Sequence, residues 1–139
     1  MPTKTTSIGL NTKGNADIMD ITDQAAKLVT ESGIKNGIVT IFCSSSTSAI
    51  TTIEYESGCL SDLRRLFDEI ADPNRHYAHN ARWGDGNGHS HVRAAMLGAS
   101  LTVPFVSGRL TLGTWQQIIF VDFDTRPRQR ELVVQILGD

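Results

Sequence analysis

The chain has 139 residues, of which 40% are hydrophobic and 20% are charged, and its formal net charge is -2. This near-neutral charge gives no general attraction to nucleic acid or to anionic membranes, so we expect neither as a partner. No apolar run is long enough for a signal peptide or a membrane-spanning helix, which predicts a cytoplasmic protein.

Short strands are the commonest predicted element. Each predicted segment either is β-branched and apolar or alternates in polarity, as half-buried strands do. We expect strands over residues 3–10, 16–21, 37–43, 49–53, 100–106 and 131–136. Residues 109–123 form one long strand or two strands broken near Gly113 and Thr114.

Three segments predict helices. Thr22 or Asp23 is positioned to cap the first helix, and Gly33 to end it. Leucine, phenylalanine and isoleucine recur at helical spacing over residues 60–71, and a short helix follows over residues 91–97. The strands outnumber the helices and lie mostly close in sequence. We therefore expect one α+β domain over the whole chain, with a largely antiparallel sheet, curled or sandwiched, and helices on one side.

All four histidines fall within sixteen residues, and three of them lie in a polar, glycine-rich segment (residues 72–90) that predicts a long connection without regular structure. They are His76, His79, His89 and His91. Imidazole is the commonest metal ligand and the usual acid–base group near neutral pH. In an extended chain His89 and His91 point to the same side, so three of the four histidines could approach one divalent ion. The alternative is a polar surface loop without a site.

A glycine-rich stretch, Trp83 to Gly88, separates the two histidine pairs. Glycines let backbone N–H groups approach an anion closely, which makes Gly86, Asn87 and Gly88 candidates for binding phosphate. Asp85 is a candidate to orient a histidine or to bind a metal. A plain turn is the alternative.

The hydroxyl-rich turn from Ser44 to Ser48 directly follows a predicted buried strand. Ser46 and Thr47 are candidates for binding phosphate there, although such a run also makes an ordinary turn. No G-x-S-x-G motif supports a serine nucleophile. Glu54, after the next strand, is a candidate general base or ligand, with a solvated charge as the alternative.

Two further groups lie near the C-terminus. Trp115 and Gln116 could stack on and hydrogen-bond a planar ring, unless the tryptophan belongs to the core. Arg126, Arg128 and Arg130 alternate along the chain, so in an extended segment they face one way. Such a row suits phosphate or carboxylate recognition or a subunit contact, and a solvated edge is the alternative.

These pieces, in this order, resemble the YjbQ family over nearly the whole chain. The matching stretches are Ser46-Thr47-Ser48-Ala49, Tyr77-Ala78-His79, Asn87-Gly88-His89-Ser90-His91, Leu97-Gly98-Ala99-Ser100, Val103-Pro104 and Gly108 to Gln116. The most specific part is L-G-T-W-Q together with the upstream histidines.

Some positions of this chain match the recurring residues of the family, and others do not. His79 and His91 fall on the family's recurring histidines, whereas His89 looks like a feature of a subgroup. Many members have a histidine where this chain has Ser46, and N-E where it has Glu54 and Tyr55. These departures weaken the case for a metal ligand in the serine-rich turn.

The resemblance implies a sandwich- or barrel-like β core, a trimer, and a secondary thiamine-phosphate synthase activity. That reaction joins hydroxymethylpyrimidine diphosphate to thiazole phosphate and releases pyrophosphate. We expect a phosphorylated metabolite as ligand and no organic cofactor. His79, His91, Asp85 and Glu54 are the expected catalytic residues, and His79, His89 and His91 the expected ligands for zinc or magnesium.

Two other functions remain open at this stage. The sequence lacks an acidic motif for magnesium diphosphate, which counts against efficient synthase chemistry. The alternatives are a non-catalytic oligomer that binds a phosphometabolite or a metal, and a metal-dependent phosphoesterase.

Overall fold

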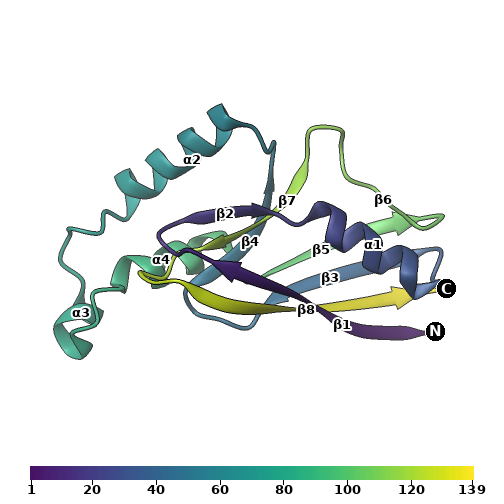
Figure 1. Cartoon of the computed structure of the whole chain (residues 1–139), viewed down its shortest axis with the longest axis horizontal. Coiled ribbons are helices and arrows are strands. Elements are labelled where there is room, and N and C mark those ends of the chain that lie inside the picture. Colours follow the sequence, from purple (N-terminus) through teal and green to yellow (C-terminus); the bar gives the residue numbers. More distant parts are fainter.

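Two antiparallel β-sheets and four helices make up the protein, which a computed structural model describes from Met1 to Asp139 (Figure 1). The five-stranded sheet contains, in spatial order, β1 (Thr3–Thr12), β8 (Arg128–Gly138), β3 (Gly37–Cys43), β5 (Ser100–Val106) and β6 (Arg109–Leu110). The three-stranded sheet contains β2 (Asp17–Asp20), β7 (Gln117–Asp122) and β4 (Ser48–Ile53). The helices are α1 (Thr22–Ser32), α2 (Ser57–Ile70), α3 (Ala78–Trp83) and α4 (Gly88–Leu97). None of them combines the length and the apolar character that crossing a membrane requires.

Alternating side chains divide the molecule into layers. In β8, Leu132 and Ile136 are buried, whereas Val133 and Leu137 point outward. The buried face of the five-stranded sheet packs against α1 and the inner face of the three-stranded sheet. The other face of the three-stranded sheet packs against α2 and α4. The predicted α+β fold with antiparallel pairing is thus confirmed, and the outer face of the five-stranded sheet is the layer that no helix of the chain covers.

Helix α1 ends where the sequence predicts but is capped differently. Gly33 adopts the left-handed conformation, with φ of 74°, and terminates the helix. The expected cap at Thr22 or Asp23 is wrong, because Ile21 occupies the cap position. The carboxylate of Asp20 accepts the N–H of Thr22 at 2.9 Å, and the Thr22 hydroxyl accepts the N–H of Ile118 on β7 at 2.8 Å.

Helix α2 begins one turn before its predicted start. The side chain of Glu56 accepts hydrogen bonds from the backbone N–H groups of Gly58 and Cys59, which satisfies donors that the first turn leaves free. The apolar periodicity could not show this turn, because Ser57, Gly58 and Cys59 carry small side chains.

The prediction that residues 72–90 lack regular structure is wrong. They contain α3 and the first turn of α4, which begins at Gly88 rather than at His91. The side-chain oxygen of Asn80 accepts the Gly88 N–H at 2.8 Å and so fixes the start of α4 against α3.

The segment from Arg109 to Phe123 contains two strands rather than one, which confirms the second of the two predicted alternatives. Strand β6 belongs to the five-stranded sheet and β7 to the three-stranded sheet, so residues 111–116 must cross between them. The Gly113 N–H donates to the Gln116 side chain at 3.0 Å and closes this turn. Residues 113–116 therefore lie outside the strands and Gln117 begins β7, and Trp115 is 72% exposed rather than part of the core.

Buried carboxylates join the end of β7 to β8. Asp122 is fully buried and receives hydrogen bonds from Arg130 at 2.8 and 3.0 Å and from the Thr12 hydroxyl at 2.6 Å. Asp124 is also buried and pairs with Arg128 at 2.7 Å. Burial opposes ionisation of Asp122, but the hydrogen bonds from Arg130 and Thr12 outweigh it and hold the pKa of that carboxyl below its usual value.

We expect Arg130→Met to lower the free energy of unfolding by about 3–5 kcal/mol at neutral pH, because it leaves the Asp122 charge buried without its partner. Urea denaturation measures this loss. Arg126→Met is the matched control, since Arg126 is exposed and forms no ion pair, and it should change stability by less than about 0.5 kcal/mol.

The pairing of Asp122 with Arg130 also makes the free energy of unfolding depend on pH. Because the pKa of Asp122 is depressed in the folded state, its contribution is present above the ordinary value of 3.8 and is lost as the pH falls below it. The gap between the wild type and Arg130→Met should therefore narrow in acid. Equal stability of the two arginine variants at neutral pH would contradict the assignment.

Candidate functional site

Helices α3 and α4 bring His79 and His91 together at one end of the molecule, on the left in Figure 1. Their ring centroids lie 4.5 Å apart, with the ring planes inclined at 56°. The Nε2 atom of His79 lies 3.2 Å from a carboxylate oxygen of Asp85 and 2.9 Å from the side-chain amide of Asn87. Four of the predicted site residues are therefore gathered in one place.

The loop between the helices folds back because of its glycines. Gly84 and Gly86 have φ values of 70° and 68°, a conformation that residues with a Cβ rarely adopt. Gly88 packs directly on Tyr77, and a Cβ atom at this position would lie 2.5 Å from the Tyr77 Cβ. This close contact seats α3 against the start of α4.

His89 does not join the other two histidines. Successive residues of a helix are about 100° apart, so His89 and His91 point to nearly opposite sides of α4. His89 is 5% exposed, lies beside Tyr77, and its Nδ1 has no hydrogen-bond partner. Burial and then the charge of Arg93 lower the pKa of His89, which favours the neutral ring. The convergence expected for an extended segment is absent because α4 begins before His89.

A hollow of about 340 Å³ adjoins His91. Serine side chains from the turn after β3 form one wall, and small residues of α4 and the following turn form the other. Ser48 is 2% exposed, and its hydroxyl oxygen has no hydrogen-bond partner. The lining residues are Ser45, Ser46, Ser48, His91, Ala94, Ala95, Gly98 and Ala99.

Thr47, Arg128 and Arg130 belong to the buried network around Asp122 and Asp124. The hydroxyl oxygen of Thr47 accepts a hydrogen bond from Arg130 at 2.9 Å. Arg128 and Arg130 are paired with Asp124 and Asp122, so they brace the serine-rich turn from behind. Arg126 is exposed and belongs neither to this network nor to the site at His79 and His91. The expectation of three arginines forming one free row is thus wrong, because two of them neutralise buried carboxylates.

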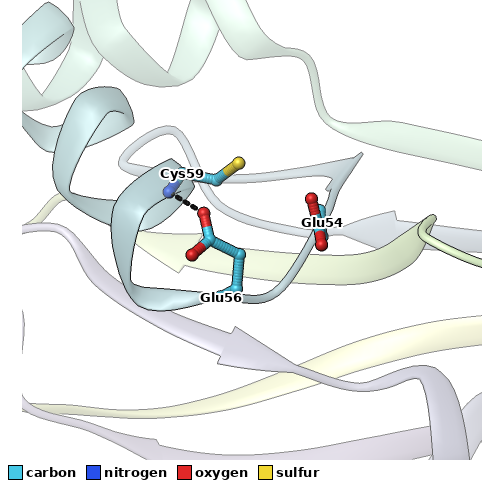
Figure 2. A group of neighbouring side chains, drawn as sticks. All are labelled: Glu54, Glu56 and Cys59. Carbon is cyan, nitrogen blue, oxygen red and sulfur yellow. Dashed lines mark hydrogen bonds between the residues drawn. The ribbon is translucent and has the colours of Figure 1, made fainter.

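Glu54 lies with Glu56 and Cys59 instead of with the histidines (Figure 2). One ligand atom from each of the three residues lies within 4.8 Å of the others. A hydrogen bond from the Cys59 side chain lowers the pKa of Glu56, and Glu56 raises the pKa of the Cys59 thiol to about 11. The Glu56 side chain also accepts the N–H groups of Gly58 and Cys59 at the start of α2, so its observed role is that of a helix cap.

Trp115 and Gln116 lie on the crossing loop between β6 and β7. The Gln116 amide donates to the Thr52 hydroxyl on β4 at 3.2 Å, which anchors the loop. Neither residue lines the hollow beside His91. Their predicted contact with a planar ring stays a prediction, and it concerns the surface of this loop rather than the hollow.

The residues near His79 are of the types that bind a divalent metal, but their donor atoms do not converge on one point. His79 and His91 offer imidazole nitrogens and Asp85 a carboxylate, the ligand types that zinc accepts. No three of these donor atoms lie within 4.8 Å of one another, and His89 is directed elsewhere.

Three residues that support the site carried no signal in the sequence. The Asn80 amide holds the start of α4, the Ser90 hydroxyl donates to the carbonyl of Phe123, and Arg93 donates to the carbonyl of Ala71. The partners of Ser90 and Arg93 are distant along the chain, and that of Asn80 lies across the glycine-rich loop. The spacing of four between His89 and Arg93 would have indicated a shared helix face only if the helix start had been known.

The layered fold and the paired imidazoles beside a serine-lined hollow define a small α+β protein with a candidate polar site at its helical end. The chain belongs to the YjbQ family, since the family described as UPF0047 protein YjbQ-like matches residues 6–139.

Relatives and solved structures agree with this assignment. A UPF0047 protein of Methanothermobacter thermautotrophicus is 40% identical over 99% of this chain and 94% of its own length. The UPF0047 protein YugU of Bacillus subtilis is 34% identical over 95% of this chain and 98% of its own. A crystal structure of a protein of unknown function from Sulfolobus solfataricus, described as YbjQ-like, is 37% identical, with a TM-score of 0.89 over 99% of this chain and 100% of that one.

Gly88→Ala should destabilise the protein by about 1–3 kcal/mol, because the new methyl group overlaps Tyr77 and forces α3 away from α4. Thermal and urea denaturation measure the loss. Gly113→Ala is the matched control, because its methyl group would meet only the Gln116 side chain at ordinary contact distance. Equal tolerance of both substitutions would contradict the close packing of the two helices.

Proposed function

We propose that the site at His79 and His91 binds a small phosphorylated metabolite and supports a slow thiamine-phosphate synthase reaction. The observation that carries the proposal is the pairing of the two imidazoles, 4.5 Å apart, beside a hollow lined by serine hydroxyls. We also propose, from the family resemblance, that the working form is a trimer.

The chemistry of the lining fits phosphate groups. Ser45, Ser46 and Ser48 offer hydroxyl donors, and the Ser48 hydroxyl has no partner within the chain. A phosphate oxygen would satisfy it and remove the cost of a buried polar group without a hydrogen bond. The small residues of α4 leave room for the ligand.

The paired histidines suit the departure of pyrophosphate. The thiazole nitrogen forms a bond to the methylene carbon of the pyrimidine as the bond from that carbon to the diphosphate oxygen breaks. Negative charge grows on this oxygen, and a proton or positive charge near it stabilises the transition state. His91 lines the hollow, whereas His79 is oriented by Asp85 and Asn87. We therefore assign His91 the direct role and His79 the role of proton exchange with it.

A divalent ion would be held by His79, Asp85 and His91, whose donor atoms are of the type that zinc accepts. When bound, it would supply positive charge for the phosphate oxygens. The side chain of Asp85 is 46% exposed, so it can turn toward an ion without disturbing the core.

A binding role without turnover is the second candidate. No lysine or arginine lines the hollow, and Arg128 and Arg130 are engaged by aspartates. A site without a fixed cation can hold a phosphorylated ligand but stabilises a departing pyrophosphate poorly.

The test is a thiamine-phosphate formation assay with both phosphorylated substrates, with and without a chelator. We expect slow product formation by the wild type and a loss of at least about 100-fold in His91→Ala, the range typical of an acid–base residue. His76→Ala is the matched control, because His76 is exposed and is not part of the site, and it should keep full activity.

Each outcome separates the candidates. Loss in both histidine variants would mean that the effect is not specific to the site. No product from folded wild-type protein, together with saturable pyrophosphate binding by calorimetry, would sink the synthase reaction and leave the binding role. Absence of both product and binding would contradict the whole proposal.

A further inference from the structure

A second hollow adjoins the one beside His91, and the two share Ser45 and Ser48 as lining residues. We call it the β8 hollow, because residues 129–132 of β8 line it together with the end of β3 and the serine-rich turn. Its volume is about 270 Å³, which suits a single ring rather than a large ligand.

The β8 hollow exists because β8 extends beyond the strand beside it. Strand β3 ends at Cys43, which is opposite Leu132. Strand β8 begins earlier, at Arg128, and its first residues pair with β1 alone. The chain leaves β3 into the serine-rich turn, so residues 129–131 face a hollow where a paired strand would otherwise lie.

Two buried side chains give the hollow an uncharged surface. Cys43 is 2% exposed and Leu132 is 1% exposed, and both line it. Burial raises the pKa of the Cys43 thiol to about 11, so the sulfur stays protonated at neutral pH. This part of the lining suits the apolar face or edge of a ring.

The remaining lining carries a donor and an acceptor. The Nε and Nη2 atoms of Arg130 bind Asp122, and Nη2 also binds Thr47, whereas Nη1 forms no hydrogen bond within the chain. The Arg130 side chain is 15% exposed and lines the hollow, so Nη1 is a donor that a ligand can use. Gln129 and Glu131 line it from the outward face of β8, and both are exposed.

The Ser48 hydroxyl connects the two hollows. It is buried without a hydrogen-bond partner, and Ser48 lines both spaces. A buried hydroxyl without a partner costs free energy, which a ligand lying across Ser48 would recover. This orphaned group therefore points to a ligand that enters both hollows.

The charges of the lining select the chemistry of that ligand. An anion offers only acceptors and is repelled by Glu131. A cation offers only donors and leaves Nη1 of Arg130 without an acceptor. An uncharged ring with an amino group beside a ring nitrogen offers a donor and an acceptor side by side, and so matches both groups.

We propose that the β8 hollow binds such an amino-substituted ring, with the amino group donating to Glu131 and the ring nitrogen accepting from Arg130. The hollow beside His91 can take the phosphate groups of many compounds, so the β8 hollow determines which compound is selected. The connection of the ring to phosphate groups rests on the proposed function, whereas the binding of the ring alone does not.

The test is an NMR titration of the backbone amides with 4-aminopyrimidine, at a pH where the ring is uncharged. We expect the amides of Ser44, Ser45 and residues 129–132 to shift. The matched ligand is 4-(dimethylamino)pyrimidine, which keeps the ring but has no N–H to donate, and it should leave these amides unchanged.

Glu131→Gln should weaken the binding of 4-aminopyrimidine by about five- to tenfold, because the hydrogen bond loses its charged acceptor. Glu131 is exposed, so the variant should fold as the wild type does. Glu31→Gln is the matched control: Glu31 is exposed on α1 and does not line the hollow, and its substitution should leave the affinity unchanged.

Several results would overturn the inference. They are the absence of ring binding, equal binding of the two rings, equal affinity of wild type and Glu131→Gln, and shifts of the same amides with inorganic phosphate. Ring binding without any binding of pyrophosphate would sustain the inference while the proposed function fails. Pyrophosphate binding without ring binding would overturn the inference alone.

Discussion

The pairing of Asp122 with Arg130 organises the part of the molecule that carries the candidate site. It buries two opposite charges at the junction of β7 and β8, where each requires the other. The same arginine holds the Thr47 hydroxyl, and the Phe123 N–H donates to the Thr47 carbonyl. The Ser90 hydroxyl of α4 is bound to the Phe123 carbonyl. Both walls of the hollow, the serine-rich turn and α4, are thus attached to one short stretch at the end of β7.

The histidines divide into a structural and a candidate functional group for a simple geometric reason. Helix α4 turns His89 into the interior, where burial lowers the pKa of its ring, and leaves His91 on the hollow. His79 reaches His91 from the short α3, and its position depends on Asp85 and Asn87 in the glycine-rich loop. His91 is therefore positioned by a helix of ten residues, whereas His79 is positioned by a helix of six residues and by its contacts with the loop.

The sequence predicted elements whose own side chains carry a periodic signal. The strands of the core and the helix over residues 60–71 were predicted correctly, because burial repeats along them. Helix α3 was missed, since six residues rich in polar side chains show no apolar period. The role of Arg130 could not be read locally either, because its network includes Thr12 and Thr47, more than eighty residues away. The clustering of His79 and His91 was anticipated, whereas the orientation of His89 depended on a helix start set by Asn80.

The central claim is that His79 and His91 form one site from which His89 is excluded. A titration of the imidazole resonances by NMR, first with zinc and then with pyrophosphate, tests it most directly. The account predicts that the signals of His79 and His91 move together at the same ligand concentration, while those of His76 and His89 stay unchanged. Movement of His89 with the other two, or of His91 without His79, would contradict it.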